Sequence, residues 1–254
     1  MKIHKTSIID STADIHDSVE IGPFCIIGKN VKIGPNSILH ANVQILDCSI
    51  IGENNIIHQG AIIGGDPQDL KFEGEKTHVE IGNNNVIREY CTINRGTKYH
   101  GKTVVGNNCL LMAYVHLAND CIVGDKVILA NAVQVAGHVT IGYHVTIGGI
   151  TGIHQFCKVG DHSFVGACRV ILRDIPPYIL ATGDPLKYSG INTVGLRRRG
   201  FDSELRHSIK EAYKTLYLSN YNISQAVKVI KGKNPSDEIK SILKFIEHSE
   251  RGII

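Results

Sequence analysis

Isoleucine, leucine or valine recurs at every sixth residue over most of the first two thirds of the chain. Steps of six from Ile3 to Ile171 give 29 positions, of which 26 hold one of these residues. The three residue types make up 72 of 254 residues, so chance predicts only about 8 such positions. Helices repeat near about 3.6 residues and strands near about 2. A period of six instead predicts a parallel β-helix of short strands and tight corners.

Each coil of such a β-helix is expected to contain three hexads, or about 18 residues. The hexad aliphatics then point toward the axis and pack against those of the coils above and below, which is the main stabilising contribution. Residues directly after the aliphatics, such as Asp10, Gly22 and Gly52, are expected at corners that need unusual backbone angles.

The six-residue phase fails at Asp69, at Glu75 and again at Tyr99. We therefore expect external loops near residues 64–80 and 95–102. A long insertion in a regular solenoid often lies on the binding face, so a functional role is predicted for the first loop.

The hexad pattern stops near residue 174, where DIPPY (174–178) is expected to end the winding. Apolar residues at helical spacing then predict helices over 201–218, 223–231 and 236–248. The expected organisation is a β-helical domain over 1–185 and a helical domain over 186–254. A helical cap covers strand edges that the last coil would otherwise expose.

Composition narrows the classes of function. A net charge of +3 is too small to predict nucleic-acid binding. The N-terminal sequence lacks an apolar signal core, and no apolar run of 18 residues occurs, so a cytoplasmic protein without an integral membrane segment is expected. Five of the seven cysteines share one small-residue slot, two residues before a hexad aliphatic, which predicts buried structural thiols; these are Cys25, Cys91, Cys109, Cys121 and Cys157.

Residues 18 apart should occupy the same corner of successive coils. This spacing stacks Asn119, Gly137 and Gln155, and one position later Asp120, His138 and Phe156. His116 and His154 lie close by in the same frame. Three histidines and an acid near one wall predict a site there.

Several motifs resemble one family closely: QDLKFEGE (68–75), IRE (87–89), NRGT (94–97), LLM (110–112), LANAVQVAGHVTIG (129–142), GGITGIHQFCKVG (148–160), DIPPY (174–178) and GLRRRGF (195–201). Together they resemble the UDP-N-acetylglucosamine O-acyltransferases, along essentially the whole chain. The resemblance implies a left-handed parallel β-helix and a homotrimer with sites between neighbouring chains. It also implies transfer of a 3-hydroxyacyl chain from acyl carrier protein to the 3-hydroxyl of the UDP-sugar, the first step of lipid A biosynthesis, without metal or organic cofactor.

The same resemblance assigns roles to individual residues. The Gly137 N–H is expected to hold the oxyanion, and Asp120 to orient the general base. The sugar and phosphate pocket is expected to include Asp69, Lys71, His116 and His138. The nucleotide and its diphosphate are assigned to His154, Gln155, Asn192, Arg198 and Arg199, arginine being suited to a diphosphate by its planar fork of donors. Ala167 is expected at the position that measures the acyl chain, where a glycine leaves the groove long.

One departure from the family affects the mechanism. The general base of the family is a histidine just before the aspartate, but here Asn119 precedes Asp120. Asn94 also stands where the family often has histidine. An amide cannot accept a proton near neutral pH. Three explanations stay open: a His-to-Asn inactivated variant, an N-acyltransferase that acts on a UDP-3-amino-sugar, or a silent sugar-nucleotide-binding protein.

Overall fold

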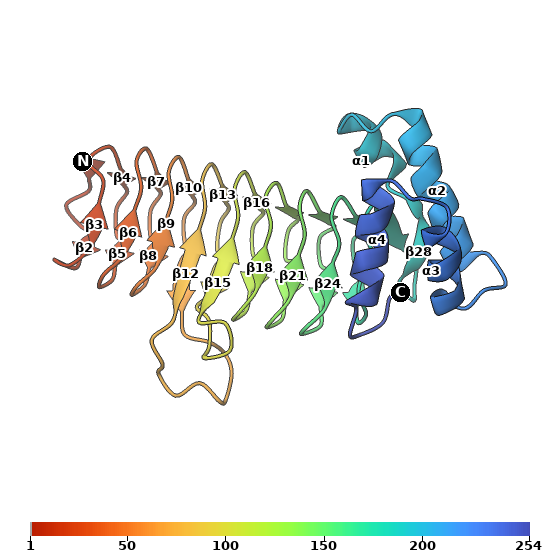
Figure 1. Ribbon diagram of the computed structural model, residues 1–254. Helices are drawn as coiled ribbons and strands as arrows, with labels where there is room; N and C mark the ends of the chain where they lie inside the picture. Colours follow the sequence, from red (N-terminus) through yellow and green to blue (C-terminus); the bar gives the residue numbers. More distant parts are fainter. Residues whose placement is uncertain (1) are drawn as a thin grey trace.

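The computed structural model describes residues 2–254 and contains one long parallel β-helix that ends in a group of helices (Figure 1). The N-terminus lies at the open end of the coil, and the C-terminus lies among the helices. The predicted β-helix with a helical cap is therefore confirmed.

Three sheets run along the coil, and each strand contributes to the sheets in turn. Sheet 1 consists of β1 (Lys2–Ile3), β4 (Glu20–Ile21), β7 (Ile38–Leu39), β10 (Ile56–Ile57), β13 (Val86–Ile87), β16 (Leu110–Leu111), β19 (Ile128–Leu129), β22 (Thr146–Ile147), β25 (Phe164–Val165), β27 (Ile179–Thr182) and β28 (Lys187–Ile191). Sheet 2 consists of β2 (Ile8–Ile9), β5 (Ile26–Ile27), β8 (Gln44–Ile45), β11 (Ile62–Gly65), β14 (Thr92–Asn94), β17 (His116–Leu117), β20 (Gln134–Val135), β23 (Gly152–Ile153) and β26 (Val170–Ile171). Sheet 3 consists of β3 (Asp14–Ile15), β6 (Lys32–Ile33), β9 (Ile50–Ile51), β12 (His78–Ile81), β15 (Lys102–Val105), β18 (Ile122–Val123), β21 (Thr140–Ile141) and β24 (Lys158–Val159).

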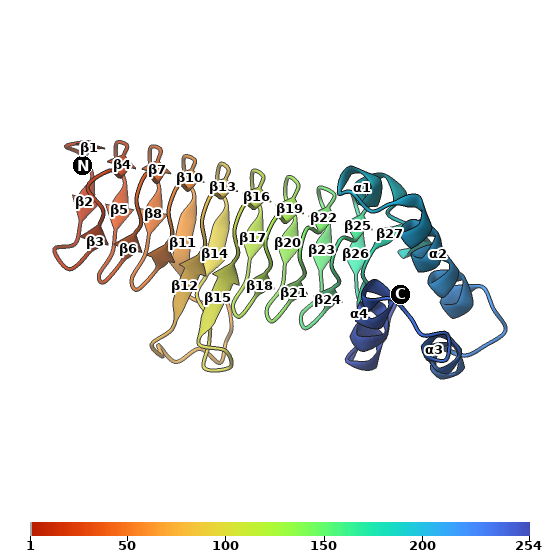
Figure 2. The same ribbon diagram turned by 45° about the horizontal axis from the view of Figure 1, so that its top comes forward.

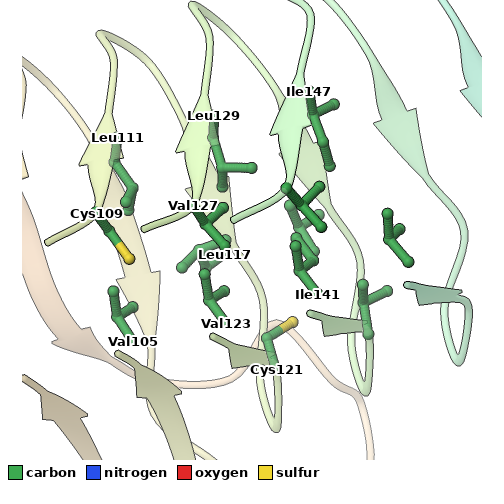
Figure 3. Close-up of a cluster of buried hydrophobic side chains, with 14 of the residues drawn as sticks. Val105, Cys109, Leu111, Leu117, Cys121, Val123, Val127, Leu129, Ile141 and Ile147 are labelled. Atoms are coloured by element: carbon green, nitrogen blue, oxygen red, sulfur yellow. The ribbon is translucent and has the colours of Figure 1, made fainter. Parts of the chain in front are cut away.

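Strand register confirms the predicted coil length. Ile3 pairs with Ile21 in parallel, 18 residues further along the chain. The hexad aliphatics fill the interior, where the buried side chains of successive coils lie one above another (Figure 3). All five cysteines of the small-residue slot are buried among them, as predicted.

The reason for glycine after the aliphatics differs from the prediction. The left-handed conformation occurs two residues further on, as at Phe24 with φ 59°. Gly22 does not adopt it. A Cβ on Gly22 would instead lie 3.0 Å from the carbonyl carbon of His40 in the next coil. Glycine is required there because successive coils approach closely, not because the backbone angle is unusual.

Two segments leave the coil between strands, and they hang together from one side of the β-helix (Figures 1 and 2). The first lies between β11 and β12, and the second between β14 and β15. Ile51 pairs with Ile81 and Ile81 with Val105, so the separation of partners widens at both segments before it returns to 18 residues.

The winding does not end at DIPPY. Phe164 still pairs in parallel with Leu180 on β27, and β27 then forms an antiparallel hairpin with β28. Pro176 and Pro177 lie between strands, where no ladder bond is needed from their nitrogens. The hairpin and the helix that follows it were not expected from the sequence. The hairpin includes residue 185, so the domain boundary at that position stays a prediction.

Four helices follow: α1 (Thr193–Arg198), α2 (Ser203–Tyr217), α3 (Ile223–Lys231) and α4 (Asp237–Glu247). The last three match the predicted helices. Asp202 caps α2, and Asn222 and Gln225 form a capping box on α3. Tyr213 on α2 is fully buried and donates a hydrogen bond to the carbonyl of Pro177, which joins the cap to the last coil. Within residues 2–254, no helix combines the length and apolar character needed to cross a membrane.

Candidate active site

A groove of about 930 Å³ runs along the corner between sheets 2 and 3, under the two external segments. The structure brings eight of the predicted site residues to its wall: Asp69, Lys71, His116, Asn119, Gly137, His138, His154 and Gln155. Phe156, Val170 and Leu172 add an apolar part to the wall. The groove therefore offers both polar groups and an apolar surface along one side of the coil.

The predicted stack of corner residues is present. His138 N donates to Asn119 O over 2.9 Å, and Phe156 N donates to Gly137 O over 3.1 Å, so three successive coils are joined at this corner. A Cβ on Gly137 would lie 3.2 Å from both Nδ2 and Oδ1 of Asn119. Among residues 2–254, the Gly137 N–H donates to no protein atom. It is therefore available to a ligand in the groove.

Asp120 lies behind the wall with a side chain that is 0% exposed. Thr97 donates to it twice, from its N–H over 3.0 Å and from Oγ1 over 2.6 Å, and His100 N donates over 3.2 Å. Asn119 Nδ2 completes the set over 2.9 Å to Oδ2. Several donors surround the carboxylate, which satisfies a charge that would otherwise be costly to bury.

Three of these hydrogen bonds come from the second external segment. Sequence analysis did not assign roles to Thr97 and His100, nor to Tyr99, whose ring lies 4.7 Å from that of His138. The signal that could have pointed to them is the break in the hexad phase at Tyr99 itself. Residues that leave the coil have no partner within the repeat, so their contacts are made elsewhere.

His138 is held between two aromatic rings. Its ring stacks on Phe156, with centroids 4.4 Å apart and planes 1° from parallel. Its Nδ1 lies 3.7 Å from Asp120 Oδ2, and Asn119 Nδ2 lies 3.5 Å from its Nε2. Burial lowers the pKa of His138, which favours the neutral imidazole.

The other two histidines of the wall have different partners. His116 Nδ1 lies 2.8 Å from Thr92 Oγ1 on the neighbouring strand, and burial lowers its pKa as well. His154 is exposed, and its Nδ1 donates to the carbonyl of Gln155 over 3.1 Å. Neither has a carboxylate beside it, so His138 alone among these three is paired with an acid.

The two external segments hold each other over the groove. Arg95 forms an ion pair of 2.8 Å with Asp66, and its guanidinium lies 5.2 Å from the ring centroid of Phe72. Asn94 is buried, and its amide donates to the carbonyl of Asp66. Asn94 thus fastens the first segment to the coil and does not line the groove.

In the first segment, Asp69 Oδ1 accepts from Lys71 N over 2.9 Å. This local turn places both predicted residues at the edge of the groove. Leu70 between them is fully exposed.

Three predicted residues lie on a different side of the molecule. Asn192 caps α1 through Gly195 N and donates to His162 O over 2.9 Å. Arg199 also contacts His162 O, over 3.2 Å, and Arg198 lines a second pocket of about 750 Å³ on sheet 1. His162 follows β24 at the corner between sheets 3 and 1. A single chain therefore does not bring these residues to the groove, because they occupy another corner of the triangle.

Burial and the nearby Arg199 guanidinium lower the pKa of His162 to about 4. Ala167 is exposed at the third corner, between sheets 1 and 2. Its expected part in measuring the acyl chain stays a prediction. Among residues 2–254, no three or more His, Cys, Asp or Glu side chains are grouped so that they could hold a metal ion.

The coiled hexads and the groove on one corner define a hexapeptide-repeat transferase. A family model described as bacterial transferase hexapeptide (six repeats) matches residues 30–65 and 102–137. A second model, described as UDP N-acetylglucosamine O-acyltransferase, domain 2, matches residues 174–254.

Full-length relatives identify the family. The acyl-[acyl-carrier-protein]–UDP-N-acetylglucosamine O-acyltransferase of Thiobacillus denitrificans is 47% identical, over 99% of this chain and 98% of its own length. A UDP-N-acetylglucosamine acyltransferase structure from Bacteroides fragilis has a TM-score of 0.98 and 47% identity, with 99% of each chain covered. One from Arabidopsis has a TM-score of 0.89 and 31% identity, again with 99% of each chain covered. The chain belongs to the UDP-N-acetylglucosamine O-acyltransferase family, as its motifs predicted, and its β-helix is the left-handed one expected with them.

Proposed function

We propose that the chain transfers a 3-hydroxyacyl group from acyl carrier protein to the 3-hydroxyl of UDP-N-acetylglucosamine, the first step of lipid A biosynthesis. The observation that supports this proposal is the groove beside Asn119, Gly137 and Gln155, in a chain similar over 99% of its length to acyltransferases named for that donor and acceptor. The reaction takes place between soluble substrates, and we place it in the cytoplasm. It requires neither a metal nor an organic cofactor.

Transfer from a thioester to a hydroxyl develops negative charge on the former carbonyl oxygen. We assign the free Gly137 N–H to that oxygen, because a preorganised donor of this kind contributes about 10²–10³-fold to the rate. Asp69, Lys71, His116 and His138 then face the sugar and its phosphates. These assignments stand on the position of each residue on the wall of the groove.

Nucleotide binding is proposed to require more than one chain. His154 and Gln155 line the groove, whereas Asn192, Arg198 and Arg199 lie at another corner of the same molecule. In a homotrimer with parallel coils, the arginines of one chain would lie beside the groove of its neighbour. The fully exposed Leu70 at the edge of the groove supports an interface there, since a single exposed leucine of this kind gains from burial against a partner.

Asn119 favours a second candidate function. Its amide cannot accept the proton of a hydroxyl, but a neutral amine attacks a thioester before it loses a proton. A UDP-3-amino-sugar would thus place a smaller demand on a base. The buried amide, bonded to Asp120 over 2.9 Å, is the specific observation for N-acylation.

One set of assays separates these functions. The chain as it stands and its Asn119→His variant are given acyl carrier protein and coenzyme A thioesters, with UDP-N-acetylglucosamine or its 3-amino analogue as acceptor. O-acylation by the chain as it stands supports the main proposal, and efficient N-acylation supports the second. A gain of O-acylation that appears only with histidine at 119 indicates an inactivated variant.

Binding without turnover would leave a silent sugar-nucleotide-binding protein and would contradict both catalytic proposals. Calorimetry with the UDP-sugar measures that binding. Sedimentation equilibrium tests the trimer separately. Mixing an Arg199→Ala chain with a Gly137→Ala chain should restore part of the activity if each site uses residues from two chains.

A further inference from the structure

We infer that His138, oriented by Asp120, is the general base that takes the proton from the acceptor hydroxyl in this chain. This inference rests on the proposed transferase function. It gives the base a different position from the residue before Asp120, since that residue is Asn119. The base would then come from the next coil, directly above the aspartate.

The geometry places one acid and one imidazole together. Asp120 Oδ2 lies 3.7 Å from His138 Nδ1, and the aspartate side chain is 0% exposed while the histidine is 12% exposed. His138 Nδ1 itself is enclosed and has no hydrogen-bond partner among residues 2–254. The exposed part of the ring therefore belongs to its other atoms. A small inward shift would let Nδ1–H donate to Asp120 and leave Nε2 with a free lone pair, as catalytic bonds often tighten only with substrate bound.

Both members of the pair are held in place by contacts that do not depend on a ligand. Thr97 and His100, on the second external segment, donate to Asp120 and hold its carboxylate. The His138 ring stacks on Phe156 and meets the edge of Tyr99, at 4.7 Å between centroids. The ring plane is thereby held between two aromatic side chains. A base needs this kind of fixed orientation, in the way that an acid orients the histidine of a catalytic triad.

The charge around His138 suits a base near neutral pH. Burial lowers its pKa, and the nearby His100 lowers it further, whereas Asp120 and Asp69 raise it. The net direction is downward, so the ring stays neutral at pH 7 and can accept a proton.

The other candidate bases on the wall are less suited. His116 is tied to Thr92 Oγ1 and faces no carboxylate. His154 is exposed, and its Nδ1 donates to its neighbour's carbonyl. Asp69 lies in the exposed turn with Lys71 and accepts a backbone hydrogen bond. Only His138 combines an enclosed carboxylate partner with a place beside the Gly137 N–H.

The step balances as follows. The acceptor oxygen forms a bond to the thioester carbonyl carbon while its proton passes to His138 Nε2. The resulting tetrahedral oxyanion is held by the Gly137 N–H. It collapses with cleavage of the carbon–sulfur bond, and the imidazolium returns its proton to the departing thiolate. The products are the ester and the free thiol of acyl carrier protein, and His138 is neutral again.

The test compares four chains: the unchanged protein, His138→Gln, Asn119→His and the double variant, each with acyl carrier protein thioester and UDP-N-acetylglucosamine. We expect His138→Gln to lower kcat by about 10²–10⁴-fold, with a far smaller change in the calorimetric Kd of UDP-N-acetylglucosamine. The double variant should regain most of the loss, because the end of side chain 119 already reaches Asp120 Oδ2. His16→Gln, at an exposed histidine in the first coil, is the control and should match the unchanged chain.

The pH profile gives a second readout. kcat/KM of the unchanged chain should fall as pH decreases through the lowered pKa of His138, below its ordinary value of 6.5, because the imidazolium cannot accept a proton. This acid limb should be absent from the remaining activity of His138→Gln. A structural or purely binding role for His138 would instead change Kd and would not be rescued by histidine at 119.

Two failures are distinguishable. If the unchanged chain transfers no acyl group to either acceptor, the proposed function is wrong and the inference with it. If the unchanged chain is active and His138→Gln keeps its kcat and its acid limb, the function stands and the assignment of the base is overturned.

Discussion

Thr97 Oγ1 donates a hydrogen bond of 2.6 Å to Asp120 Oδ2, from an external segment to a corner of the coil 23 residues later. Thr97→Val keeps the shape of the side chain and removes this donor to a buried carboxylate. We expect the free energy of unfolding to fall by about 1.5–3 kcal/mol, as for a lost hydrogen bond to a charged group, with a fall in kcat. Urea unfolding and the acyl-transfer assay measure the two effects.

The matched control is Thr12→Val, since Thr12 Oγ1 makes a similar bond of 2.7 Å to the exposed Asp10. Water replaces that bond when it is lost, so its effect on stability should be much smaller. Equal losses for the two variants would contradict the role assigned to the buried Thr97–Asp120 contact.

Gly137→Ala tests the close packing at the corner. The added methyl would lie 3.2 Å from both polar atoms of the Asn119 amide, so the amide must move by a few tenths of an ångström. Because small displacements at a reacting centre are costly, we expect kcat/KM to fall by about tenfold to a hundredfold while the fold persists. Gly232→Ala, where the new methyl meets atoms no closer than 3.6 Å, is the comparison. Wild-type activity in Gly137→Ala would argue against a reacting centre at this glycine.

Neighbouring isoleucines in one strand provide a test of the core. Ile27 points to the axis and is 1% exposed, whereas Ile26 points outward and is 38% exposed. Ile27→Ala should lower the free energy of unfolding by about 2–5 kcal/mol, and Ile26→Ala by about 0.5 kcal/mol. Urea unfolding of both variants checks the difference. A loss at Ile26 as large as that at Ile27 would contradict the inward orientation of the hexad aliphatics.

Thiol reactivity should divide the seven cysteines into two groups. Burial raises the pKa of Cys91 and of Cys121 to about 12, and Cys48 and Cys168 are exposed. A thiol with a raised pKa stays protonated at pH 8 and is a poor nucleophile. We expect two thiols to react rapidly with Ellman's reagent in the folded protein and all seven after denaturation. Rapid reaction of a third thiol would show that the core opens at one of the five buried positions.

The acyl chain length is the subject of the last prediction. If Ala167 shortens the groove, Ala167→Gly should raise the kcat/KM ratio of longer to shorter acyl donors, by about tenfold for one methylene-sized change. Competition between two acyl carrier protein thioesters in one reaction measures that ratio directly. An unchanged ratio would remove Ala167 from the acyl site.

The hexad period made much of this molecule predictable. It predicted the coil length, the inward aliphatics and the stack of Asn119, Gly137 and Gln155, because in a solenoid each residue contacts the residue one coil away. Sequence distance and spatial position are linked by a fixed rule there. The helices α2, α3 and α4 were also predictable, since apolar spacing and capping residues are local signals.

Contacts without a repeat could not be predicted. Nothing in the order of residues placed Thr97 and His100 on Asp120, or Tyr99 on His138, because these residues leave the coil and meet whatever lies beside them. The hairpin of β27 and β28 was missed since a turn-rich stretch carries no strand period. Likewise, only the three corners of the folded coil separate His138 from Arg199 and Ala167. The sequence by itself determined the coil and which residues share a corner, and the tertiary structure decided which groups surround Asp120 and therefore which histidine is paired with it.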